Sequence, residues 1–283
     1  MTTMTVPSKL DAATKSAVID LLYRLADDGL IIGHRNSEWT GIGPILEEDI
    51  AFSSMAQDKM GHALAFYRLL HELGEPDPER NTFERGPEAF RCCSLVAMEF
   101  LSAGSNHGDL CNNPVRDELM HRGDWCGSLV RQFLFAEADA VRMAALEDNA
   151  YEPLAHIARK LRGEIKYHTL HGRLLMEKLG RATPESGQRL QAALTKLWPH
   201  ALGIFEPTRF ESALAAAKIC PPESELCDQW RSEVTPIIAK AGLTIPANAT
   251  PHYGGRAGKH GPELAAVLDA MQRVYKLSPR ATW

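Results

Sequence analysis

The chain has 283 residues, 45% of them hydrophobic, which is enough to bury one sizeable core in a single domain. Its 31 basic and 36 acidic side chains give a formal net charge of -5, and the scattered basic residues argue against nucleic-acid binding. The N-terminus lacks the apolar segment of a secretory signal, and no apolar run approaches the roughly 20 residues of a membrane span, so we expect a cytoplasmic protein.

Apolar residues recur at helical spacing over most of the chain, and no segment shows the alternation of a β-strand. Asp11 is placed to cap the first helix, and Gly74 and Pro76 end the second. The four longest predicted helices span residues 11–34, 44–73, 125–148 and 153–180. Two helical pairs joined by a long crossover are typical of an all-α, ferritin-like four-helix bundle.

The segments outside these helices are less regular. Within the crossover, residues 90–100 are apolar and form either a short helix or a loop over the core, and residues 103–123 have the composition of an insertion. Further helices are predicted over residues 184–205, 206–218, 223–241 and 263–275. We interpret residues 1–283 as one ferritin-like domain, with a core bundle at about 11–205 and a C-terminal helical extension at about 206–283.

The second and fourth helices each carry a histidine at similar depth, His62 and His168. Ferritin-like oxygenases hold two irons with a Glu from each of two helices and a Glu-x-x-His motif from each of the other two. Here the residue three positions before the histidine is Lys59 in one helix and Ile165 in the other. Because residues three apart lie on the same side of a helix, these replacements remove one ligand from each motif.

Carboxylates are still present nearby, since Asp58 and Glu164 lie four residues before the two histidines. We interpret the set as a vestigial metal site with neither a metal nor a catalytic role, formed by Asp58, Lys59, His62, Glu164 and His168. A distorted mononuclear site stays open as an alternative, as does a pair of ordinary hydrogen-bonded core histidines.

Lys59 lies on the apolar side of its helix, although lysine is rarely buried without a partner. We hypothesise that its ammonium replaces the charge of a metal by pairing with Glu164, Asp27 or Asp28. The alternative is that the side chain extends to the surface.

At these residues the chain resembles the family of non-catalytic, ferritin-like subunits of the bacterial phenylacetyl-CoA epoxidase, a multicomponent monooxygenase of aerobic phenylacetate degradation. The resemblance covers most of the chain outside the insertion. The positions that carry it are Glu38-Trp39, Pro44 with Asp49, Asp58, Arg131-Gln132-Phe133, Glu164 with Tyr167-His168, Lys196-Leu197-Trp198, Tyr253-Gly254-Gly255-Arg256 and Trp283.

The resemblance implies a structural subunit without a cofactor of its own, which pairs with and stabilises a homologous catalytic diiron subunit. Further small subunits and a reductase would complete the complex, by hetero-oligomerisation or self-association. Compared with the catalytic pattern, Ala136 stands where the third helix would supply an acidic ligand, and Glu137 is one position out of phase.

Other functions stay open from the residues alone. One is an autonomous ferritin-like, metal-dependent oxidoreductase that uses Asp58, His62, Glu164 and His168, so whether the chain is itself an enzyme is undecided. Another is a regulatory or adaptor bundle.

A glycine-rich segment near the C-terminus carries two cations, Arg256 and Lys259. Such a backbone could hold a phosphate, which makes these residues candidates for contact with the phosphates of CoA. The segment lacks the strand and helix of a nucleotide-binding loop, so a turn that holds the last helix against the body is the alternative interpretation.

Overall fold

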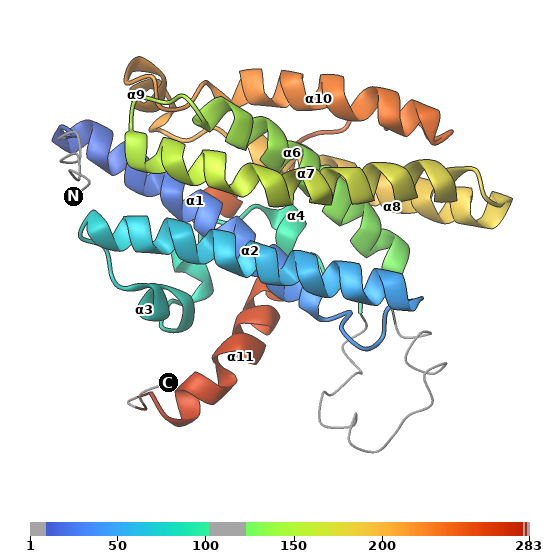
Figure 1. The fold of residues 1–283 in the computed structure, drawn as a ribbon, viewed down its shortest axis with the longest axis horizontal. Helices are drawn as coiled ribbons and strands as arrows, with labels where there is room; N and C mark the ends of the chain where they lie inside the picture. Colours follow the sequence, from blue (N-terminus) through green and yellow to red (C-terminus); the bar gives the residue numbers. More distant parts are fainter. Residues whose placement is uncertain (1–9, 102–122, 280, 282–283) are drawn as a thin grey trace.

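The computed structural model describes residues 10–101, 123–279 and 281, where regular structure is helical apart from one isolated bridge between Leu101 and Gly123. The four longest helices are α1 (Ala12–Ser37), α2 (Leu46–Glu72), α6 (Trp125–Leu146) and α7 (Glu152–Gly180). Helix α1 packs along α2, α6 packs along α7, and α2 also contacts α7 (Figure 1). A long crossover joins the two pairs, so the predicted ferritin-like bundle is confirmed.

The ends of these helices follow from local chemistry. The Asp11 carboxylate accepts a hydrogen bond of 2.9 Å from the backbone N–H of Thr14, so Asp11 caps α1 as predicted. Helix α2 begins at Leu46, two residues later than predicted, because Ile45 still has an extended backbone. Three acidic residues in the first turn of α2 suit the positive end of the helix dipole.

Shorter helices surround the bundle. They are α3 (Pro78–Phe83), α4 (Ser94–Ala97), α8 (Pro184–Leu202), α9 (Glu211–Ala216), α10 (Glu223–Lys240) and α11 (Pro262–Leu277), with 3-10 turns η1 (Pro87–Ala89), η3 (Gly203–Phe205) and η4 (Gly255–Ala257). Helices α8 and α10 pack against α6 and α7, whereas α11 contacts α1, α3 and α4. The helix predicted over residues 206–218 is observed only as α9.

The predicted insertion at 103–123 lies almost entirely outside the described residues, as does Trp283. The apolar segment at 90–100 combines α4 with irregular backbone over the core. Across the described ranges, the helices are too short or too polar to span a membrane.

One hydrophobic core connects the bundle with the C-terminal extension. Trp230 of α10 and Leu264 of α11 belong to the same buried cluster as Leu21 of α1 and Phe133 of α6. The rings of Trp198 and Trp230 stack with 5.0 Å between their centroids. The C-terminal extension is therefore packed into the body of the bundle.

Buried ion pairs attach distant segments to α1. Asp27 of α1 accepts hydrogen bonds from the guanidinium of Arg85 and from the hydroxyl of Tyr67. The neighbouring Asp28 pairs with Arg256 of η4 at 2.8 Å. Because a buried carboxylate is costly without a counter-charge, these contacts fix the crossover and the glycine-rich segment to the bundle.

Glu223, at the start of α10, bonds to two buried arginines, Arg24 of α1 at 2.7 Å and Arg142 of α6 at 2.7 Å. Burial by itself would raise the pKa of this carboxyl, but the charge and hydrogen bonds of Arg142, together with Arg24, lower it to about 2. The carboxylate therefore stabilises the folded state wherever it is ionised.

We predict that Glu223→Gln lowers the free energy of unfolding by roughly 3–5 kcal/mol at neutral pH, because it leaves the buried Arg142 without a counter-ion and Arg24 with Asp20 alone. Urea denaturation followed by circular dichroism measures the change. Glu84→Gln is the matched control, since Glu84 forms an exposed pair with Arg80 and should matter little.

The wild type and Glu223→Gln also test how the stability of the fold depends on pH. Because the pKa of Glu223 is about 2 in the folded protein and 4.5 without the fold, its stabilising effect is complete above 4.5 and is lost as the pH falls toward 2. The stability of the wild type relative to Glu223→Gln should therefore decrease over this interval. Parallel pH profiles for the two proteins would contradict the assignment.

Candidate functional site

Among the described residues, three pairs of histidine and carboxylate connect α2 and α7; one joins His171 to Glu48 at 2.9 Å, and the other two contain the predicted site residues. His62 Nε2 of α2 lies 2.7 Å from Glu164 Oε2 of α7, and His168 Nε2 of α7 lies 3.0 Å from Asp58 Oδ2 of α2. The two imidazole rings stack with 6.2 Å between their centroids. Each histidine is therefore bonded to a carboxylate of the opposite helix, and the structure brings these four predicted residues together.

Lys59 lies in the same region with its side chain 1% exposed, and its Nζ forms an ion pair with Asp139 of α6. The prediction that Lys59 is buried and paired is confirmed, but all three proposed partners are wrong. Glu164 bonds to a histidine, and Asp27 and Asp28 are neutralised by the arginines described above. The lysine thus connects α2 to the third long helix of the bundle.

Asp139 is the acidic residue that sequence analysis missed on α6. Ala136, where a ligand was sought, is completely buried, and Glu137 accepts two hydrogen bonds of 2.6 Å from Arg173. Asp139 lies three residues beyond Ala136 and therefore on nearly the same side of the helix. Asp139 could have been found from the sequence by considering every acidic residue on the side of α6 that carries Ala136.

The imidazoles are held in their neutral form. Burial, strengthened by the positive charge of Lys59, lowers the pKa of both His62 and His168 to about 2. Burial also raises the pKa of Glu164, where the charge of Asp58 adds to the effect, and of Asp58 itself. In this state each neutral ring can donate an Nε2–H bond to its carboxylate, which leaves Nδ1 of His168 buried without a partner.

The residues of this centre do not fit a pair of irons. In the part of the chain that the structure describes, no group of three or more His, Cys, Asp or Glu side chains is arranged to hold a metal ion. The ammonium of Lys59 adds a positive charge beside both histidines, and Ile165 is apolar and only 3% exposed. The arrangement supports a network of hydrogen bonds and one ion pair between three helices.

The candidates for a CoA-phosphate site are separated by the fold. Arg256 is buried, pairs with Asp28 and donates to the backbone oxygens of Arg91 and Ile204 at 2.8 and 2.9 Å. Lys259 is exposed. The two cations therefore do not act together at the surface, and η4 fastens the C-terminal segment to the core, in agreement with the alternative interpretation.

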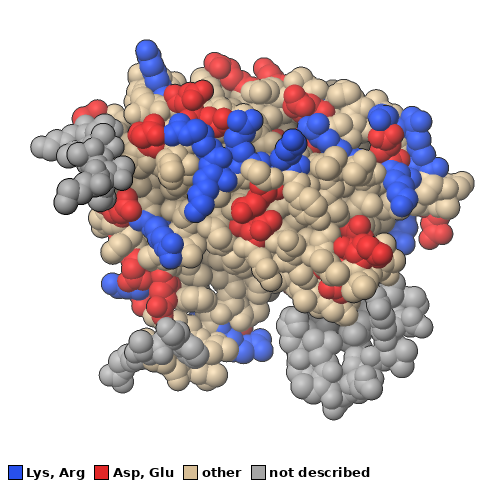
Figure 2. All heavy atoms as spheres, viewed as in Figure 1, with Lys and Arg blue, Asp and Glu red and all other residues tan. Residues whose placement is uncertain are grey.

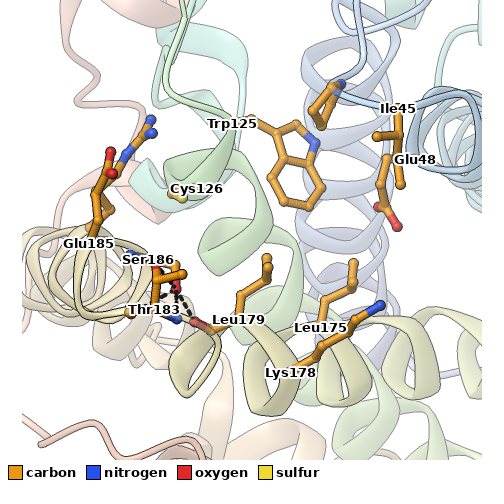
Figure 3. A pocket seen from close by; sticks show the side chains of 12 residues that line it. Ile45, Glu48, Trp125, Cys126, Leu175, Lys178, Leu179, Thr183, Glu185 and Ser186 are labelled. Carbon is orange, nitrogen blue, oxygen red and sulfur yellow. Dashed lines mark hydrogen bonds between the residues drawn. The ribbon is translucent and has the colours of Figure 1, made fainter.

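An apolar pocket of about 410 Å³ opens between the start of α2, the start of α6, the end of α7 and the start of α8 (Figure 3). Ile45, Trp125, Leu175 and Leu179 line it, and Lys178 lies at its side. Sequence analysis did not predict this pocket, because its walls come from four separate helices.

Helices α2 and α7 also present apolar side chains to the solvent. We call this set the α2–α7 apolar face; its members, each at least 39% exposed, are Leu46, Ile50, Leu64, Tyr167, Leu170 and Leu174. On α7 they follow one another at helical spacing and share one side. Figure 2 shows Lys and Arg side chains concentrated along the upper part of this view, whereas the surface over α2 is mostly uncharged with carboxylates between. Exposed apolar side chains that share one side of a helix are a candidate interaction site.

We predict that Lys59→Met lowers the free energy of unfolding by roughly 3–5 kcal/mol, because it leaves the largely buried Asp139 without a counter-charge. The double variant Lys59→Met/Asp139→Leu should regain much of this loss, since it removes both charges. A double-mutant cycle in urea measures the coupling. Lys276→Met, which breaks an exposed pair with Asp269, is the control and should change stability little. Equal destabilisation by the single and the double variant would contradict a coupled pair.

Comparison with known proteins shows the family of this chain. The chain is 28% identical over 261 residues to one of the subunits of the 1,2-phenylacetyl-CoA epoxidase of Escherichia coli (strain K12), an alignment that covers 92% of this chain and 96% of that relative. A family model described as phenylacetic acid catabolic protein matches residues 1–283. The chain therefore belongs to the phenylacetic acid catabolic protein family, whose members share a ferritin-like helical fold.

Proposed function

We propose that this chain is a non-catalytic, structural subunit of a cytoplasmic phenylacetyl-CoA epoxidase, in which it pairs with and stabilises a homologous catalytic diiron subunit. The observation that carries the proposal is the buried ion pair between Lys59 and Asp139, beside two histidines held in the neutral form. A lysine ammonium and a metal cation would repel each other there. The likeness to a phenylacetyl-CoA epoxidase component from Escherichia coli supports both the complex and its substrate.

The α2–α7 apolar face supports the structural role. A catalytic bundle that admits a large acyl-CoA needs a mobile side, and a rigid homologous bundle docked against it can offset the lost stability by burying apolar surface. The exposed leucines of α7 and the nearby apolar pocket offer such a surface. Pairing of two related bundles would resemble the contact of an ancestral homodimer. Further small subunits and a reductase would complete the complex.

The absence of a diiron centre is tested by restoring its ligands. We predict that the wild-type chain, purified after loading with ferrous iron, holds far less than one iron per chain by mass spectrometry of the metals. Lys59→Glu combined with Ile165→Glu recreates Glu-x-x-His on both helices and removes the repelling ammonium, so this variant should bind iron in clear excess over the wild type.

Lys59→Met with Ile165→Met is the matched control, because it removes the lysine charge without adding ligands. Near-stoichiometric iron in the wild-type chain, with oxygen-dependent turnover by the chain alone, would overturn the structural role. That result would establish the alternative of an autonomous oxidoreductase.

The pairing is tested on the apolar face. We predict that Leu170→Asp/Leu174→Asp weakens binding to the co-expressed homologous, ligand-complete subunit by at least tenfold, because each charge would be buried without a partner in the interface. Both leucines are more than half exposed, so the isolated chain should keep its fold. Native mass spectrometry and titration calorimetry measure the complex.

Val274→Asp/Leu277→Asp is the control, since these residues are 59% and 79% exposed but lie on α11. It should leave the affinity unchanged. If the α11 variant dissociates the complex and the α7 variant does not, the proposed surface is wrong.

A further inference from the structure

A second pocket, of about 380 Å³, lies between α1, the segment before α9 and η4, away from the site described above. Its polar lining is Asp20, Arg91, Glu206, Thr208, Arg209 and Arg256. Three of these six side chains are arginines from segments far apart in the sequence. The fold therefore concentrates guanidinium groups in one concave site.

Both acidic residues of the pocket are engaged in other contacts. Asp20 forms an ion pair with Arg24 at 3.1 Å and accepts a hydrogen bond from the Thr208 hydroxyl at 3.3 Å. Glu206 Oε2 accepts the backbone N–H groups of Gly254 and Arg256 at 2.8 and 3.2 Å. Across the described residues, neither carboxylate forms an ion pair with an arginine that lines the pocket.

The arginines retain unused donors. Among the described residues, no carboxylate lies within ion-pair distance of Arg91 or Arg209. Arg91 donates from Nη1 only to the backbone oxygens of Glu88 and Phe90. Arg256 is 5% exposed, and although it pairs with Asp28, its Nε is buried without any partner. A buried polar group without a partner is unusual and calls for a ligand or water.

The backbone beside these arginines is already shaped for an anion. Gly254 has a φ of 128°, which turns the chain at the start of η4, where the N–H groups of residues 254 and 256 both donate to one carboxylate oxygen of Glu206. Concave backbone sites of this type bind phosphate and other anions. Here an internal carboxylate occupies the position.

We infer that this pocket binds the phosphate or pyrophosphate group of a small molecule, held by Arg91 and Arg209, with Glu206 acting as the internal competitor for the backbone amides. Arginine is suited to this role because its planar, permanently charged guanidinium can donate two parallel hydrogen bonds to a phosphate. The pocket volume lies within the range of small-molecule sites, so more than an inorganic ion can enter. The inference does not depend on the function proposed above.

The test uses the full chain and inorganic pyrophosphate, with affinity measured by titration calorimetry at constant ionic strength. Arg91→Ala/Arg209→Ala should weaken binding by about tenfold for each guanidinium removed. Glu206→Gln should tighten binding several-fold, because it removes the competing charge and keeps an oxygen that can accept the same N–H groups. Unfolding cannot explain a variant that binds pyrophosphate more tightly than the wild type.

Arg181→Ala/Lys259→Ala is the matched control, since it removes two exposed cations outside the pocket and should leave the affinity unchanged. Coenzyme A and adenosine diphosphate both carry a pyrophosphate group. The one that binds with the higher affinity identifies the kind of small molecule that supplies this group. No binding of pyrophosphate by the wild type, or equal loss in the pocket and control variants, would overturn the inference.

Discussion

The ion pair between Lys59 and Asp139 is the contact on which the middle of the bundle depends. An ammonium group in a helical core is tolerated only with a counter-charge, so α6 must present its carboxylate to α2. Helix α1 also lies close to this lysine: a Cβ added at Gly33 would be 3.2 Å from Lys59 Cβ. The position of the lysine therefore constrains three of the four long helices at once.

The same electrostatic requirement explains why segments distant in the sequence are necessary to the fold. Asp27 and Asp28 are consecutive, buried residues of α1, and each receives its counter-charge from outside the bundle, one from Arg85 in the crossover and one from Arg256 in η4. The C-terminal extension is thus a source of charge compensation as well as of apolar packing. Arg256 also lines the second pocket, and its Nε is buried without a hydrogen-bond partner.

The chemistry of the centre and the character of the surface support the same function. Neutral histidines, an internal ammonium and an apolar Ile165 give a centre whose hydrogen bonds and ion pair join three helices of the bundle. The apolar side chains are exposed on the outer sides of α2 and α7, the two helices that carry the histidines. In the proposed complex, one pair of helices would serve both to stabilise the subunit internally and to bind its partner.

Much of the fold and part of the candidate site could be predicted from the sequence alone. Helical periodicity and capping residues such as Asp11 determined the bundle, and the positions of Lys59 and Ile165 before the two histidines showed that neither Glu-x-x-His motif is complete. These features depend on spacing along a single helix, which the sequence contains directly. Only the tertiary structure decided which carboxylate neutralises Lys59 and that Arg256 is buried. Such pairings depend on how separate helices cross, because a buried charge takes whichever partner the packing brings within reach.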